Sequence, residues 1–429
     1  MNKRPALMPS GTPVKRVATG KDLLCRSCAS DELGIVLDLG TTPLANALLT
    51  REQLHLPEPR YPLQVAFCSE CSLLQITETV PPELLFRNYF YFSSFSDAFL
   101  RAAEEIATRL ITERKLNGES LVLEIASNDG YLLQFYKQRR IPVLGIEPAI
   151  NVATAAREMR GIPTRNEFFG WDLARRVFEE GLKADVIHAN NVLAHAADLD
   201  GFLSGLRLVL KDDGVAVIEV PYVQDMIDRV EFDTIYHEHL YYFSLFALDY
   251  LCAAHGLRIA DVEHLAVHGG SLRLFIEHEH ESIHRPASVE ELLSEEEKQG
   301  LNSPEYYHAF AGRVQQLKSM LLGLLRDLKS AGHRVAAYGA SAKGSTLLNC
   351  FGIDQQILDF VVDRNTVKQG RFTPGTHLPI YSPAKLLEAQ PNYTLLLTWN
   401  FAEEIFAQQA EYLRRGGRFI VPIPEPKVI

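Results

Sequence analysis

The chain has 429 residues, 47% of them hydrophobic and 23% charged, with a formal net charge of −11 at pH 7. This composition is typical of a globular protein with about two to four domains, and the negative charge argues against a general affinity for nucleic acid or anionic membranes. No stretch of about eighteen residues is apolar and the N-terminus lacks a hydrophobic signal region, so we expect a cytoplasmic protein without a membrane span.

Two pairs of cysteines follow a polar N-terminal segment, residues 1–20, which we expect to be disordered. The pairs are Cys25 with Cys28 and Cys68 with Cys71. Each C-x-x-C motif can present two thiolates to one ion, and two such motifs complete the tetrahedral shell of a structural zinc site. The alternative is two unconnected reduced pairs. We therefore predict a zinc-binding domain over residues 21–85, in which the segment between the pairs forms a small hairpin or loop.

An unusually aromatic stretch, residues 86–96, comes next. Most of its rings are expected to pack between the zinc-binding domain and the following domain. Tyr89, Tyr91 and Ser93 also carry hydroxyls, which predicts that they line a polar substrate pocket. A helical pattern over residues 97–116 then leads into the central part of the chain.

The central part opens with an apolar run, Leu121 to Ile125, that predicts a buried parallel strand. Small and turn-forming residues follow it, and a helical pattern begins at Tyr131, so the segment is a β-loop-α unit of the kind that opens a nucleotide-binding sheet. The loop residues expected at the cofactor are Ala126, Ser127, Asn128 and Gly130.

Two acidic residues mark the same predicted site. Glu124 lies inside the first strand, where a carboxylate has little reason to be buried unless it meets a cationic or hydroxyl-bearing ligand. Glu147 ends the second strand, Val143 to Ile146, and is placed to bind the ribose hydroxyls of an adenosine. The G-x-G-x-x-G fingerprint is absent apart from Gly130, which favours S-adenosylmethionine over a dinucleotide. Another adenosine ligand or a purely structural unit are the alternatives.

The alternation of helix and strand continues through residues 151–220. A strand over 184–188 is followed by Asn190, Asn191 and His195, which we expect beside the cofactor because ligands bind at the carboxyl ends of parallel strands. Further along, Tyr236, His237, Glu238 and His239 form a histidine- and tyrosine-rich motif. Metal binding or a structural role are alternatives for this motif, but general acid/base chemistry is favoured because the pKa of histidine lies near neutrality.

The C-terminal part, residues 286–429, repeats the α/β architecture after a long helix over 304–330. A strand at 334–338 is followed by a loop, 339–345, and a helix at 346–350. Lys343 in this loop offers an ammonium beside a helix N-terminus, which predicts an anion site. A second strand, 357–362, is followed by basic residues that include Arg371. Two α/β sheets in one chain suggest a cleft between them that holds one reactant on each side.

Together these segments resemble the sugar C-methyltransferase family, which acts on nucleotide-linked 4-keto hexoses. The similarity rests on the paired C-x-x-C motifs, the Tyr-Phe-Ser-Ser stretch at 91–94, the motif at 123–133, Gly-Ile-Glu-Pro at 145–148, Asn-Asn-Val-Leu-Ala-His at 190–195, the motif at 236–244, His-Gly-Gly-Ser-Leu-Arg at 268–273 and Tyr-Gly-Ala-Ser-Ala-Lys-Gly at 338–344. The chain has Ala126 where relatives commonly carry glycine, a small change that leaves the site in place.

The resemblance implies a zinc-binding domain, a Rossmann-like methyltransferase domain over 86–285 and a C-terminal Rossmann-like domain over 286–429, with substrate between the last two. It also implies a catalytically silent zinc and His239 as general base, with Tyr236, Glu238 and His195 around the reacting ring. We expect metal-independent C-methylation next to the ketone of a nucleotide-linked 4-keto-deoxyhexose. A methyltransferase on a non-sugar ketone and a non-catalytic nucleotide-sugar-binding protein are the alternatives, and the oligomeric state is not indicated. The residues expected to bind substrate are Tyr89, Tyr91, Ser93, Asn191, Lys343 and Arg371.

Overall fold

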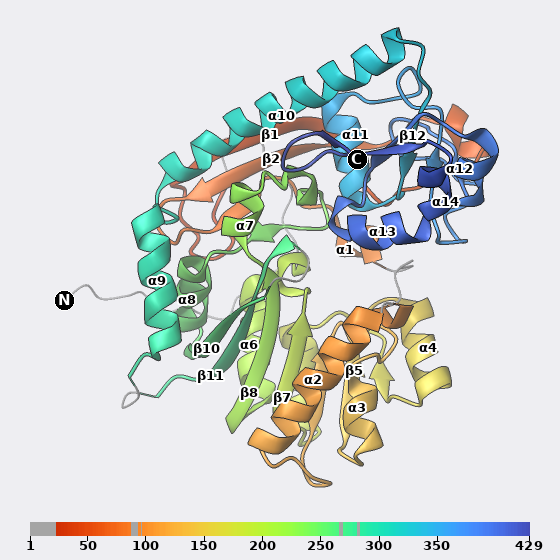
Figure 1. The fold of residues 1–429 in the computed structure, drawn as a ribbon. Coiled ribbons are helices and arrows are strands. Elements are labelled where there is room, and N and C mark those ends of the chain that lie inside the picture. Colours follow the sequence, from red (N-terminus) through yellow and green to blue (C-terminus); the bar gives the residue numbers. More distant parts are fainter. Residues whose placement is uncertain (1–22, 87–92, 96, 266–268, 281–283) are drawn as a thin grey trace.

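The computed structural model describes residues 23–86, 93–95, 97–265, 269–280 and 284–429. Their backbone forms three β-sheets of four, seven and six strands with helices around them (Figure 1). No helix in these ranges is long and apolar enough to cross a membrane. Segment 1–20 and the predicted substrate residues Tyr89 and Tyr91 lie outside the described residues.

The four-stranded sheet is antiparallel and includes one strand from much later in the chain. Its order is β1-β2-β3-β9, with β1 Leu33–Pro43, β2 Arg60–Cys68, β3 Leu74–Ile76 and β9 Tyr241–Tyr242. β1 and β2 form the hairpin expected between the cysteine pairs, and a short 3-10 helix, η1 (Glu52–His55), lies between these strands. β9 joins the sheet through the pairing of Tyr241 with Gln75. The segment directly after the His-Glu-His motif is therefore part of the N-terminal sheet.

The seven-stranded sheet has the order β10-β11-β8-β7-β4-β5-β6. Its parallel strands are β4 Val122–Ile125, β5 Val143–Ile146, β6 Thr164–Arg165, β7 Ala184–Asn190 and β8 Leu210–Pro221, and its antiparallel edge is formed by β10 Leu257–Leu265 and β11 Ser271–His278. Every residue of β4 and β5 is buried, as expected of parallel strands that are covered on both faces. The strand order reverses between β4 and β7, and this reversal is where open α/β sheets bind ligands.

Helices cover the two faces of this sheet. Val122 of β4 packs against the side of α2 and α3, where Leu110 and Leu133 lie in the same buried cluster. The next residue, Leu123, faces the other side and belongs to the cluster that contains Leu203 of α6, because successive strand residues alternate between faces. The helices of this part are α2 Asp97–Glu113, α3 Leu133–Gln138, α4 Ile150–Arg160, α5 Trp171–Glu179, α6 Leu199–Val209, α7 Val223–Asp228 and α8 Leu245–Ala254. Short elements between them and before them are α1 Pro82–Phe86, η2 Ser93–Phe95, η3 Leu193–His195 and η4 Phe232–Thr234.

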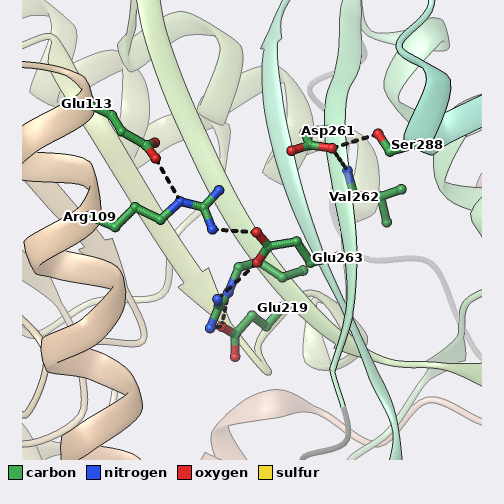
Figure 2. A network of polar contacts seen from close by, with 8 residues as sticks. Arg109, Glu113, Glu219, Asp261, Val262, Glu263 and Ser288 are labelled. Carbon is green, nitrogen blue, oxygen red and sulfur yellow. Dashed lines mark hydrogen bonds and ion pairs between the residues drawn. The ribbon is translucent and has the colours of Figure 1, made fainter.

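A chain of ion pairs fastens α2 to the antiparallel edge of the central sheet (Figure 2). Arg109 pairs with Glu263 of β10, and the guanidinium lies 4.8 Å from the ring centroid of Phe275 on β11. Glu263 also pairs with Arg273, whose guanidinium reaches Glu219 of β8 with a nitrogen–oxygen distance of 2.7 Å. Because these groups are partly buried and share partners, the network holds the β10–β11 hairpin in place more strongly than one exposed ion pair can.

The six-stranded sheet forms the C-terminal part, with the order β14-β13-β12-β15-β16-β17. Its strands are β12 Val335–Tyr338, β13 Val361–Val362, β14 Ile380–Tyr381, β15 Tyr393–Leu396, β16 Arg418–Val421 and β17 Lys427–Val428. All neighbours are parallel except β16 and β17. Its helices are α11 Ala342–Phe351, α12 Ala384–Ala389, η6 Trp399–Phe401, α13 Ala402–Gln408 and α14 Ala410–Arg414.

Two helices connect the central and C-terminal sheets, α9 (Ala287–Gln299) and α10 (Pro304–Ser330). α10 has the bounds expected from the sequence and runs along the outside of β1 and β2 (Figure 1). The rings of Tyr307 on α10 and Phe67 on β2 stack with centroids 4.6 Å apart. The N-terminal sheet is thus packed between the long helix and the rest of the molecule.

The first helix of the C-terminal sheet differs from its prediction. α11 begins at Ala342 rather than at residue 346, so Lys343 lies in its first turn and not in a loop. Ser341 caps the helix by accepting a hydrogen bond from the Gly344 amide, with an N–O distance of 3.0 Å. Gly344 is required by close packing, because a Cβ there would lie 2.8 Å from Cβ of Leu397. The second strand is also shorter than predicted, since β13 contains only residues 361–362.

Candidate active site

A cavity of about 850 Å³ lies where the three sheets meet. The central sheet contributes the carboxyl ends of β4, β5, β7 and β8, and the C-terminal sheet contributes the segments after β12, β13 and β15. The hairpin of the N-terminal sheet contributes residues 44 and 46–48. A cleft between two α/β sheets was predicted, whereas a wall contributed by the cysteine-containing module was not.

On the central-sheet side, the loop after β4 and the end of β5 are joined by Glu147. Its carboxylate accepts hydrogen bonds from the backbone amides of Asn128 and Ala149, at N–O distances of 2.9 and 2.8 Å. Burial raises the pKa of Glu147 to about 7. Ala126 and Asn128 have positive φ values of 55° and 49°, so the backbone turns sharply where the strand ends. All four residues line the cavity.

Of the other residues predicted at the cofactor, one lines the cavity and the rest do not. Asn190 lines the cavity, and its buried amide oxygen has no hydrogen-bond partner among the described residues. Glu124, Ser127 and Gly130 do not line it. Gly130 has a φ of 77°, and a Cβ there would lie 2.8 Å from Ile162, so it shapes the turn behind the cavity wall.

Glu124 is buried behind the cavity wall, on the α2 and α3 side of the sheet. Burial, followed by the neighbouring carboxylates of Glu147 and Asp129, raises its pKa well above the usual value. Behind the same wall, the Tyr136 hydroxyl and His188 Nε2 are 2.8 Å apart. Glu124 is thus buried, but it does not reach the cavity surface.

His239 is held in one tautomer by its two hydrogen bonds. Its Nδ1 lies 2.8 Å from the carbonyl oxygen of Thr234, which can only accept, so Nδ1 carries the proton. The Tyr236 hydroxyl lies 3.0 Å from Nε2 and therefore donates to it. Burial, and then His195, lower the pKa of His239 well below its usual value. The ring is thus neutral at pH 7, with a lone pair on Nε2.

His195 and Glu238 stand beside this ring. His195 Nδ1 donates to the carbonyl oxygen of Glu238 at 2.5 Å, and the centroids of the His195 and His239 rings are 4.9 Å apart. Burial raises the pKa of the Glu238 carboxyl to about 7. The Glu238 carboxylate accepts a hydrogen bond from the Asn46 amide of the N-terminal hairpin, at 2.7 Å between Nδ2 and Oε1. The structure therefore brings together all four residues predicted as catalytic.

His237 points away from this group. Its Nε2 lies 3.0 Å from the carbonyl oxygen of Pro62, and its ring packs edge-on against Tyr61. The rings of His237 and His239 thus bond to different parts of the chain, His237 to the carbonyl of Pro62 and His239 to that of Thr234. Within the described part of the chain, the motif forms no cluster of three potential metal ligands.

The C-terminal wall carries the basic residues of the cavity. Lys343 Nζ is buried without a hydrogen-bond partner among the described residues and lies 4.7 Å from the ring centroid of Trp399. Glu231 also lines the cavity; burial raises the pKa of this carboxyl to about 8, and the positive charge of Lys343 opposes that rise. Ser93 and Asn191 line the cavity as predicted. Arg371 does not line it, and its Nε donates to the carbonyl oxygen of Val367.

Lys368, three residues before Arg371, lines the cavity instead. Sequence reasoning also missed other polar residues of the wall, among them Asn46, Glu231 and Asp363. Asp363 directly follows β13, so its position at a strand end was a usable signal. Asn46 and Glu231 lie in irregular segments, where the sequence offers no comparable indication.

The four paired cysteines form a second cluster, away from the cavity. Their Sγ atoms all lie within 4.8 Å of one another, with 3.4 Å between Cys25 and Cys71 and 3.5 Å between Cys28 and Cys68. Zinc–thiolate bonds of about 2.3 Å in a tetrahedral shell require sulfur atoms at this spacing, so the donor set fits one zinc ion. Within the described ranges, these cysteines are the group with metal-ligand geometry.

Comparisons with known proteins agree with this architecture. Three family models match in series: a zinc-binding domain over residues 25–86, a methyltransferase domain over 93–262 and a C-methyltransferase C-terminal domain over 266–424. The chain is 37% identical over 408 residues to the C-methyltransferase NovU of Streptomyces niveus, covering 94% of this chain and 96% of that protein.

Two solved methyltransferase structures resemble part of the chain. The magnesium protoporphyrin IX methyltransferase of Synechocystis PCC 6803 with bound S-adenosylmethionine has a TM-score of 0.32 at 14% identity, over 41% of this chain and 78% of that chain. A Clostridium acetobutylicum S-adenosylmethionine-dependent methyltransferase has a TM-score of 0.35 at 10% identity, over 42% of this chain and 92% of that chain. Likeness of this degree assigns no ligand, whereas the match to NovU spans nearly the whole sequence. The chain therefore belongs to the S-adenosylmethionine-dependent C-methyltransferase family.

Proposed function

We propose that the protein transfers a methyl group from S-adenosylmethionine to the carbon next to the ketone of a nucleotide-linked 4-keto-deoxyhexose. The observation that carries this proposal is the neutral His239, whose Nε2 accepts a hydrogen bond from the Tyr236 hydroxyl in a cavity that is also lined by Lys343, a lysine without a hydrogen-bond partner among the described residues. A carbon acid needs a base before it can be methylated, and an anionic carrier needs a cation.

The cofactor is assigned to the central-sheet side. Glu147, with a carboxylate already oriented by two backbone amides, is placed to accept hydrogen bonds from ribose hydroxyls. Ala126 and Asn128 supply the turn, and Asn190 offers an unpaired amide oxygen. Glu124, Ser127 and Gly130 support this wall from behind. When bound, S-adenosylmethionine supplies the electrophilic methyl group.

The substrate is assigned to the space between His239 and the C-terminal wall. His239 removes the proton next to the ketone, so the C–H bond breaks, its electron pair enters the enolate and the proton moves to Nε2. The Tyr236 hydroxyl, which donates to Nε2 beforehand, is released to donate to the enolate oxygen or to relay the proton onward. His195 stands close enough to take either role.

Lys343 and Lys368 are proposed to bind the diphosphate of the substrate. Lys343 lies in the first turn of α11, where the helix N-terminus adds partial positive charge. Ser93 and Asn191 are left for the sugar hydroxyls. Arg371 remains assigned to the substrate side only through its proximity in sequence to Lys368. The domain division at residues 21–85, 86–285 and 286–429 is proposed on the same basis, with zinc in a structural role.

The test is turnover of S-adenosylmethionine with a panel of ketones. The panel contains thymidine-, uridine- and guanosine-diphosphate 4-keto-6-deoxyhexoses, the corresponding free sugars, and simple ketones without a nucleotide. We expect turnover only with a nucleotide-linked member. Turnover of a simple ketone instead would favour a non-sugar methyltransferase. If calorimetry detects no binding of S-adenosylmethionine at millimolar concentration, the hypothesis that the protein is a methyltransferase is wrong.

A further inference from the structure

Glu238 is reached by a side chain from a distant part of the chain. Asn46 lies in the hairpin between β1 and β2, 192 positions earlier, and donates from Nδ2 to Glu238 Oε1 at 2.7 Å. Both residues line the cavity. The contact joins the cysteine-containing module to the centre of the candidate active site.

The surrounding contacts give this hydrogen bond a defined geometry. The segment around Glu238 is held on the N-terminal sheet by two further bonds: His237 Nε2 lies 3.0 Å from Pro62 O, and Ile76 N donates to Leu240 O at 2.9 Å. The hairpin itself is fixed to the C-terminal part through Glu58, whose carboxylate accepts from the Gly375 amide at 2.9 Å. The hairpin that carries Asn46 is therefore anchored to the C-terminal part, and the segment that carries Glu238 is anchored to the N-terminal sheet.

The groups around Glu238 determine how easily its carboxyl ionises, and Asn46 is one of them. Burial disfavours the ionised carboxylate, whereas the Asn46 hydrogen bond and then the charge of Lys368 favour it. The neighbouring histidines add no positive charge at pH 7, because burial lowers the pKa of His195 and His237. Among the described residues, Asn46 supplies the hydrogen bond that the Glu238 side chain accepts.

We propose that Asn46 is a positioning residue for the active site, which holds the Glu238 carboxylate against the cavity wall and favours its charged state. The inference rests on the proposed function in so far as Glu238 belongs to the catalytic group. It assigns a part in the reaction to the zinc-binding module, beyond its folding role. The module would contribute through one amide rather than through its metal.

The direct test measures the titration of Glu238 by NMR, using protein labelled with ¹³C at the glutamate carboxyls. The Glu238 signal is identified by its loss in Glu238→Gln. In Asn46→Ala the midpoint should move up by about one pH unit, because the ionised form loses a charge-assisted hydrogen bond. Asn46→Asp keeps the shape but replaces the donor by an acid, so its midpoint should move further. A Glu238 midpoint in Asn46→Asp equal to that of the wild type would indicate that only the shape of the side chain matters, and would overturn the proposal.

The matched control is Gln64→Ala, which removes an amide of the same hairpin that donates to Asp38 rather than to Glu238. It should leave the Glu238 midpoint where it is. Zinc content of about one per chain and a cooperative thermal unfolding transition show that the variants remain folded. With a ketone from the panel, the acidic limb of the kcat profile should move with the NMR midpoint in Asn46→Ala, whereas a purely structural role lowers kcat equally at every pH.

The two claims fail separately. Wild-type protein that turns over no ketone overturns the proposed function. An unmoved Glu238 midpoint in folded Asn46→Ala overturns the inference about Asn46, whatever the activity.

Discussion

Both α/β sheets present to the cavity the loop after their first strand and an acidic side chain after their second. In the central sheet, Glu147 accepts from the amides of Asn128 and Ala149. In the C-terminal sheet, Asp363 follows β13, and its two oxygens accept from the amides of Ala340 and Asn365 at 2.8 and 2.7 Å. The backbone arrangement is the same in the two sheets.

The charge beside each loop differs. Lys343 and Lys368 both belong to the C-terminal wall, and no lysine or arginine of the central sheet lines the cavity among the described residues. A wall without cations suits a cofactor that carries a sulfonium, and a wall with two lysines suits a diphosphate. Two sheets with a similar arrangement of loop and acidic residue can therefore suit ligands of opposite charge, because a few side chains at the ends of their strands differ.

The largest effect is expected from a residue between the two walls. His239→Asn should lower kcat by roughly 10²- to 10⁴-fold, because a positioned base is lost, while the affinity for both ligands stays nearly unchanged. Steady-state kinetics with calorimetry measures both. The control is His255→Asn, which removes a ring whose Nδ1 also bonds to a backbone carbonyl but lies away from the cavity. Near-normal turnover of His239→Asn would move the base to His195 or Glu238.

The C-terminal wall is tested next with Lys343→Met. Loss of the unpaired ammonium should raise KM for the nucleotide-linked substrate by roughly 10- to 100-fold, with little change in the dissociation constant of S-adenosylmethionine. Lys385→Met is the matched control, since its ammonium also lies near an aromatic ring, 5.6 Å from that of Tyr381, but outside the cavity. Equal weakening of both ligands would remove the distinction between the walls.

A reciprocal pair of substitutions tests the two walls separately. Glu147→Gln should weaken S-adenosylmethionine by about 10-fold, because a neutral amide is a poorer acceptor for ribose hydroxyls, whereas Asp363→Asn should affect only the nucleotide-linked substrate. Since the pKa of Glu147 is raised to about 7, the wild-type affinity for S-adenosylmethionine should fall as pH drops through that value. Calorimetry between pH 6 and 8 checks this, and the glutamine variant should show no such slope.

The smallest effect concerns stability. The folded-state pKa of Glu231 is raised to about 8, above its value in an unfolded chain, so the stability it contributes is complete at low pH and is lost as pH rises through about 8. The wild-type free energy of unfolding should therefore fall relative to that of Glu231→Gln by at most about 1.4 kcal/mol per pH unit between pH 6 and 8. Denaturant titrations measure the difference. In a Lys343→Met background the slope should steepen, because the lysine opposes the shift.

Local patterns in the sequence predicted much of the fold and part of the site. The strands β4 and β5, the sharp turn at Asn128, the position of Glu147 and the bounds of α10 all agree with the structure. These features depend on hydrophobic runs, turn-forming residues and helix caps, which act over a few positions. The cysteine spacing was similarly sufficient to predict a four-thiolate cluster.

Where the structure differs from the expectation, some of the deciding contacts lie far apart in the chain. Arg371 and Lys368 are both basic and nearly adjacent, but only Lys368 lines the cavity. The Lys368 ammonium donates to the carbonyl oxygen of Ala340, whereas Arg371 Nε donates to that of Val367. The start of α11 depended on a serine cap combined with close packing of Gly344 on Leu397. Neither orientation nor packing can be read from residue type.

The amino-acid order thus specified which chemical groups the protein possesses and on which strands or turns they occur, because those assignments follow from short-range periodicity. Tertiary packing determines which of these chemical groups come into contact. β9 joins the N-terminal sheet, and Asn46 reaches Glu238 across 192 positions, only when the three sheets have packed together. Such contacts depend on the relative placement of whole elements, which is set by the summed burial of many apolar side chains rather than by any local motif.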